Sequence, residues 1–104
     1  MTVERVANSL RNARLKSQAT EGDSAWGVEV QTNKIIIFKG SDFANRDQSF
    51  DEASAISGIA NISGLSRIVF SKMYGIPQSA GTLILESDSG NKTIEINEKG
   101  FIKY

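Results

Sequence analysis

The 104-residue sequence contains no cysteine and no histidine. These absences exclude disulfide bonds, zinc sites built on cysteine or histidine, thiol nucleophiles and the Ser-His-Asp triad. Lysine and arginine total 12, aspartate and glutamate total 12, and the formal net charge is +0. This balance argues against a dedicated nucleic-acid binder, although it leaves room for a local basic patch. No apolar run approaches the roughly 18 residues of a membrane-spanning helix, and no signal-peptide pattern is visible.

What is present fits one folded domain. Hydrophobic residues make up 39% and charged residues 23% of the chain, which is not the composition of a disordered protein. Catalysis would have to rest on Asp, Glu, Lys, Ser or Tyr, and no Gly-rich phosphate loop is visible. We therefore predict a chain that is not an enzyme and that carries no cofactor and no metal.

Residues 3–20 predict a helix, because this segment has no Gly, no Pro and no aromatic residue. Small apolar side chains recur in it at helical spacing and form one narrow stripe: Val3, Val6, Ala7, Leu10, Ala13 and Ser17. Gly22 is a plausible C-terminal stop. Because the stripe is thin, we expect one side of the helix to lie on a sheet and much of the rest to face solvent or a partner.

The pattern changes to short strands after residue 22. Residues 25–31 place Trp26, Val28 and Val30 on one face, and residues 34–39 follow after a Thr-Asn turn, which predicts a hairpin. Further strands are expected at 59–63, 66–71, 81–87, 92–97 and 101–104, with turns at 88–91 and 98–100. The predicted class is α+β, with the N-terminal helix packed on an antiparallel meander.

Residues 41–58 are less regular, and their composition favours turns or weak strands. Phe43 and Phe50 are expected to attach this stretch to the core. Trp26, Phe38 and Phe70 lie on apolar strand faces and are predicted to be core residues rather than a platform for stacking bases, while Tyr104 is expected to be exposed.

Five pieces of the chain, in order and spacing, resemble the globular part of a minor pseudopilin of the type IV pilin-like FimT/GspH family. The resemblance runs from about residue 3 to the C-terminus. The helix end at 10–19 is similar to the family's Leu-x-x-Ala-Arg-x-x-Ala run. The other pieces are 26–30, 37–40, 68–70 with 75–77, and 81–85 with 93–97 and 100–102.

The resemblance implies a pilin-like head displayed on a filament. Residues 1–22 would be the C-terminal half of the spine helix, continuing upstream into a membrane-inserted apolar segment after a leader peptide, and 23–104 would be an antiparallel β head domain. The implied role is assembly of a type IV pilus or type II secretion pseudopilus. The implied partners are other major and minor pilins or pseudopilins. The implied location is the bacterial inner membrane and periplasm, or the cell exterior in a pilus.

Charge is distributed unevenly along the chain. Arg5, Arg11, Arg14 and Lys16 against Glu4 give the helix a local balance of +3, and Asp42, Asp47, Asp51 and Glu52 against Arg46 give residues 41–52 a balance of −3. A solvated helix face is the simplest interpretation. As a hypothesis, the candidate subunit contacts are Arg5, Arg11, Arg14, Lys16, Asp47 and Asp51, with basic helix and acidic loop meeting between subunits.

Three alternatives stay open. In a DNA-receptor pilin, the candidate phosphate contacts are Arg11, Arg14, Lys16 and Lys103, although the chain lacks the basic C-terminal tail of DNA-binding relatives. The acidic stretch could hold Ca²⁺, but its spacing is not that of an EF-hand. A free-standing β domain with a small-molecule ligand is the third alternative.

Overall fold

The apolar stripe forms one face of α1 (Thr2–Gln18) in the computed structural model of the protein, which describes residues 2–88 and 90–104. All six stripe residues are buried, which confirms the predicted helix and its single packed side. The helix ends two residues before the predicted limit, and Thr20 and Gly22 follow it in the left-handed region. The short turn η1 (Glu21–Asp23) leads into the first sheet. Over the described residues, no helix is both long and apolar enough to span a membrane.

The predicted hairpin is formed by β1 (Trp26–Val30) and β2 (Lys34–Lys39). Val30 lies opposite Ile35, and the Gln31 N–H donates to the Lys34 carbonyl oxygen at 2.9 Å, so the chain turns through Thr32 and Asn33 as expected. Trp26, Val28 and Val30 are buried in the main core with the stripe of α1.

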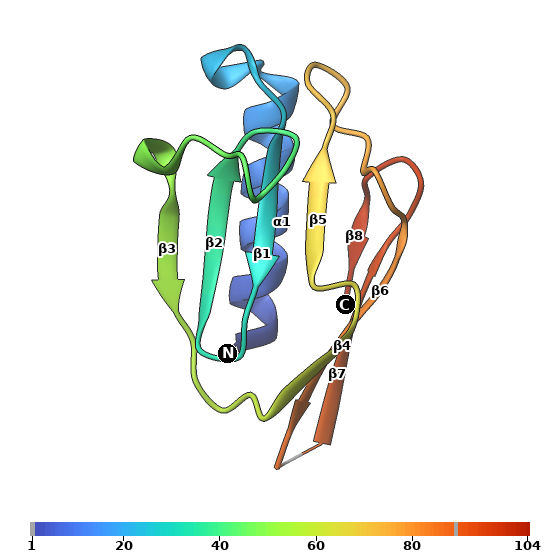
Figure 1. The fold of residues 1–104 in the computed structure, drawn as a ribbon. Helices are drawn as coiled ribbons and strands as arrows, with labels where there is room; N and C mark the ends of the chain where they lie inside the picture. The colour runs from blue at the N-terminus through green and yellow to red at the C-terminus, as the bar shows by residue number, and fades with distance from the viewer. Residues whose placement is uncertain (1, 89) are drawn as a thin grey trace.

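The strands form two antiparallel sheets, both contributing to the core around α1 (Figure 1). The first has the order β3-β2-β1-β5 and includes β3 (Glu52–Ala55) and β5 (Arg67–Phe70). The second has the order β4-β6-β7-β8, from β4 (Asn61–Gly64), β6 (Gly81–Ser87), β7 (Gly90–Ile96) and β8 (Ile102–Lys103). The α+β class is confirmed.

The expectation of one continuous meander is wrong, because β4 joins the second sheet before the chain returns to the first as β5. Inward-facing Leu83, Leu85, Ile94 and Ile96 lie in the same core cluster as the stripe of α1. A helix with one apolar stripe is too narrow to cover both sets of strands in a single sheet, so a second sheet buries this apolar surface instead.

The irregular stretch 41–58 contains η2 (Gln48–Phe50) and the edge strand β3, in line with the turns or weak strands expected there. Phe43 packs on Phe38 at 5.2 Å between ring centroids, in a second cluster on the outer face of the first sheet. Phe50 does not enter the core as predicted. It is 45% exposed, with its ring centre 6.4 Å from that of Trp26 in an edge-to-face arrangement and 4.1 Å from Lys39 Nζ, because η2 precedes an edge strand and reaches only the rim of the packed interior.

The remaining core predictions agree with the structure. Trp26, Phe38 and Phe70 are buried and Tyr104 is exposed. The turn at 98–100 forms, with the Gly100 N–H donating to the Asn97 carbonyl oxygen at 3.0 Å. The turn predicted at 88–91 includes Ser89, which lies outside the described residues, and Gly90 already pairs with Ser87 in the sheet.

Candidate interaction surface on helix α1

The cationic side chains of α1 reach two different flanks of the helix. Arg5 and Lys16 are eleven residues apart, about three full turns of the helix, and both reach toward β3. Arg11 and Arg14 point to the other side and reach the chain around β8. The β3 flank is defined here by Arg5 and Lys16. The β8 flank is defined by Arg11, Arg14, Leu15, Phe101, Ile102 and Tyr104.

On the β3 flank the charges are satisfied within the chain. Lys16 Nζ lies 3.1 Å from Glu52 Oε2 and 3.3 Å from Glu21 Oε2, and 5.0 Å from the ring centre of Trp26. Partial burial opposes the charged form of Lys16, but the hydrogen bonds to Glu52 and Glu21 outweigh it and raise its pKa. Arg5 Nη1 donates to the Ala55 carbonyl oxygen at 2.8 Å.

On the β8 flank each arginine lies beside an aromatic ring. Arg11 is 5.3 Å from the ring centre of Tyr104, and its Nη2 donates to the Ile102 carbonyl oxygen at 3.3 Å. Arg14 is 5.1 Å from the ring centre of Phe101, and its Nη2 donates to the Lys99 carbonyl oxygen at 3.4 Å. These are cation–π distances with long, weak hydrogen bonds.

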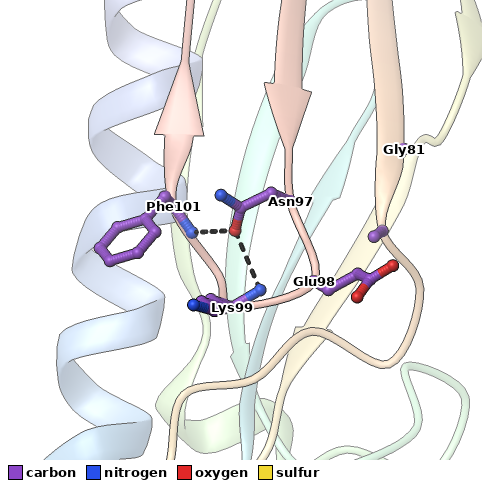
Figure 2. A pocket seen from close by; sticks show the side chains of 6 residues that line it. Gly81, Asn97, Glu98, Lys99 and Phe101 are labelled. Atoms are coloured by element: carbon purple, nitrogen blue, oxygen red, sulfur yellow. Dashed lines mark hydrogen bonds between the residues drawn. The ribbon is translucent and has the colours of Figure 1, made fainter.

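The turn that carries Phe101 is held by Asn97. Its side-chain oxygen accepts the N–H of Lys99 at 2.9 Å and that of Phe101 at 3.0 Å (Figure 2). The ring of Phe101 points toward α1, while Glu98 extends to the other side, toward Gly81 (Figure 2). The hydrogen bonds to Asn97 therefore hold the turn in a conformation that places Phe101 on the side facing α1 and Glu98 on the opposite side.

Shallow hollows accompany both flanks. One of about 290 Å³ lies on the β8 flank, lined by Arg11, Arg14, Leu15, Gly100, Phe101 and Ile102. A more open one of about 640 Å³ lies beyond the turn, lined by Ala80, Gly81, Asn97, Glu98, Lys99 and Phe101 (Figure 2). The third, of about 270 Å³, is lined by Arg5, Asn8, Ser9, Asn12 and Ser54.

The predicted acidic partners hold their own segment together. Asp51 accepts from Arg46 Nε at 3.0 Å. Asp47 accepts from the Ser49 hydroxyl at 2.6 Å and from the Ser49 N–H at 3.2 Å, and these bonds lower the pKa of Asp47. Of the acidic stretch, Glu52 reaches the basic helix, and it does so within one chain.

The structure therefore places the basic residues predicted from the sequence on two separate flanks of α1. Arg11 and Arg14 lie together on the β8 flank, to which the strand carrying Lys103 belongs, whereas Lys16 lies on the β3 flank. Sequence reasoning predicted the exposure of Tyr104 but missed the exposed Leu15 and Phe101 of the β8 flank. One signal was available, because Leu15 falls outside the buried stripe and is 61% exposed.

The described residues contain no cluster of three or more acidic side chains able to hold a metal ion. Comparison with known protein families, with curated proteins and with solved structures finds no match. A proposal for the function therefore depends on the residues exposed on and beside α1.

Proposed function

We propose that this chain is an assembly subunit of a type IV pilus or type II secretion pseudopilus, a minor subunit of the FimT/GspH kind. Its role is contact rather than catalysis, with α1 as part of the filament spine and the β sheets as the head. The proposed location is the bacterial inner membrane and periplasm, or the cell exterior in a pilus. The proposed partners are other pilin or pseudopilin subunits.

The observation that carries the proposal is the uncovered side of α1. Over its 17 residues the helix buries only one stripe, and the opposite side is left exposed at Asn8, Arg11, Asn12 and Leu15. A surface helix needs only one packed face for stability, so this arrangement permits a second contact along the same helix without unfolding the domain.

Cysteine crosslinking in the source bacterium tests the proposal. The chain has no cysteine, so Asn12→Cys in the natural gene introduces a single reactive thiol on the uncovered side. We expect a thiol-specific crosslinker to join this variant to another subunit of the filament machinery, identified by mass spectrometry. Lys92→Cys on β7, an exposed position remote from α1 in sequence, is the matched control and should give little product.

Deletion of the gene gives an independent readout. Loss of pili or of type II secretion, restored by the wild-type gene, is the expected result. Normal piliation and secretion in the deletion strain, together with no crosslink from Asn12→Cys, would overturn the proposal.

A second candidate function is DNA binding during uptake, favoured by one observation. Arg11 and Arg14 lie beside exposed aromatic rings, and such rings can stack on bases. Duplex DNA binding measured at two salt concentrations tests it. Strong affinity that falls steeply with salt would support DNA binding, whereas weak binding would leave assembly as the function.

A further inference from the structure

Arg11 and Arg14 differ from the cations that the fold pairs with carboxylates. Lys16, Arg46, Arg67 and Lys72 each form an ion pair with a carboxylate. Across residues 2–88 and 90–104, no carboxylate lies within ion-pair distance of either Arg11 or Arg14. Among the described residues, no ion pair therefore neutralises either arginine of the β8 flank.

Arg14 is the more buried of the two arginines. It is partly buried, and its Nε is buried with no acceptor among the described residues. Gly100 covers that nitrogen so closely that a Cβ built there would lie 2.8 Å from Nε. Arg14 Nη2 has only one long hydrogen bond, to the Lys99 carbonyl oxygen at 3.4 Å, so an anionic group brought to the Nη edge of this guanidinium would bind favourably.

The walls beside these arginines are apolar and exposed. Leu15 is 61%, Phe101 57% and Tyr104 54% exposed, and Leu15 and Phe101 line the same hollow of about 290 Å³ as both arginines. That volume is near the lower limit for a ligand pocket, which suits one or two side chains rather than a cofactor. The acid nearest in sequence, Glu98, points away from it (Figure 2).

We propose that the β8 flank binds an acidic peptide segment in which a carboxylate stands beside an apolar side chain. The carboxylate meets the guanidinium edges of Arg11 and Arg14, and the apolar side chain lies against Leu15 and Phe101. Each arginine lies over a ring at a cation–π distance, and this contact leaves N–H donors of the guanidinium free for a carboxylate.

A peptide fits this surface better than a nucleic acid. A nucleic-acid backbone requires a row of cations along successive phosphates. Here the other helix cations, Arg5 and Lys16, belong to the β3 flank and contact groups of their own chain. This inference goes beyond filament assembly, since the acidic segment can belong to any protein partner.

Fluorescence anisotropy with a labelled peptide that alternates glutamate and leucine tests the proposal. The comparison probes are the same peptide with glutamine for glutamate, and a labelled oligothymidylate of equal charge. We expect the glutamate peptide to bind, and to bind about tenfold more weakly to Arg14→Gln, with a smaller loss for Leu15→Ser. Lys92→Gln, which removes an exposed cation from β7, is the matched control and should leave the affinity unchanged.

A ¹⁵N correlation spectrum of each variant confirms folding, and titration of the wild type maps the contact. Shifts centred on Gly100, Phe101 and the Arg14 Nε–H support the site. The proposal would be overturned if the glutamine peptide bound as tightly as the glutamate peptide, or if Lys92→Gln lowered the affinity as much as Arg14→Gln. It would also be overturned if oligothymidylate bound more tightly than the glutamate peptide, or if no binding were seen at millimolar peptide.

Discussion

Glu29 and Arg67 form an ion pair across the neighbouring strands β1 and β5, with 2.7 Å between Arg67 Nε and Glu29 Oε2. The two partners are unequally buried: Glu29 is 6% exposed, while the arginine side chain is 48% exposed. The Glu29 carboxylate therefore depends on Arg67 for charge compensation, whereas the Arg67 guanidinium is also solvated by water.

This asymmetry predicts unequal effects of two substitutions. Arg67→Gln leaves a buried carboxylate without its cation and should lower the free energy of unfolding by about 2 kcal/mol. Glu29→Gln leaves a half-exposed arginine that water can solvate, and should cost about 1 kcal/mol or less. Urea unfolding followed by tryptophan fluorescence measures both. Equal losses would contradict the assignment of Glu29 as the dependent partner.

Leu10 and Leu15 provide a matched pair on α1. Leu10 is fully buried and Leu15 is 61% exposed. Leu10→Ala should therefore lower the free energy of unfolding by about 3 kcal/mol, from lost burial and the cavity left behind. Leu15→Ala should change it by less than about 0.5 kcal/mol. Thermal unfolding of both variants distinguishes core from surface, and a large loss for Leu15→Ala would mean that this residue packs inside the fold.

Gly64 and Gly58 separate two costs of replacing glycine. Both have positive φ, 74° and 82°, but a Cβ on Gly64 would collide with the carbonyl oxygen of Thr82, whereas one on Gly58 meets nothing within 4 Å. Gly58→Ala should cost about 1 kcal/mol from backbone strain alone. Gly64→Ala should cost about 2 kcal/mol more, because β4 must move away from β6. Denaturant midpoints of the two variants test this, and similar midpoints would show that the steric contact is relieved without cost.

The hydrogen bonds from Ser49 predict the titration of Asp47. Because they lower the pKa of Asp47 in the folded state, they stabilise the fold above the ordinary carboxyl range. That stabilisation is fully present above the ordinary pKa of an aspartate and is lost as pH falls through the lowered pKa of the folded state. Carbon-detected NMR titration should give a lower midpoint for Asp47 in the wild type than in Ser49→Ala. An unchanged midpoint in Ser49→Ala would show that the serine does not stabilise the carboxylate.

The local residue pattern was sufficient to predict the helix and the strands that have strong hydrophobic periodicity. The 3.6-residue spacing from Val3 to Ser17 predicted both α1 and its buried side, because helical geometry alone brings those positions together. Alternation around Trp26 and the two-residue Thr-Asn turn predicted the first hairpin, and the structure places the turn at those two residues. The edge strand β3 was predicted only as part of a stretch of turns or weak strands, without bounds, because all four of its side chains are exposed and show no apolar alternation.

What the amino-acid sequence determined by itself was thus the helix, most of the strands, the α+β class and the absence of histidine and cysteine chemistry. Only the tertiary structure decided that the strands divide into two sheets, that Lys16 meets Glu52 inside one chain, and that Arg11 and Arg14 stand unneutralised beside Phe101 and Tyr104. The physical reason is that periodicity records which side of an element is buried. The neighbours of an exposed charge depend on pairings between segments far apart in the chain.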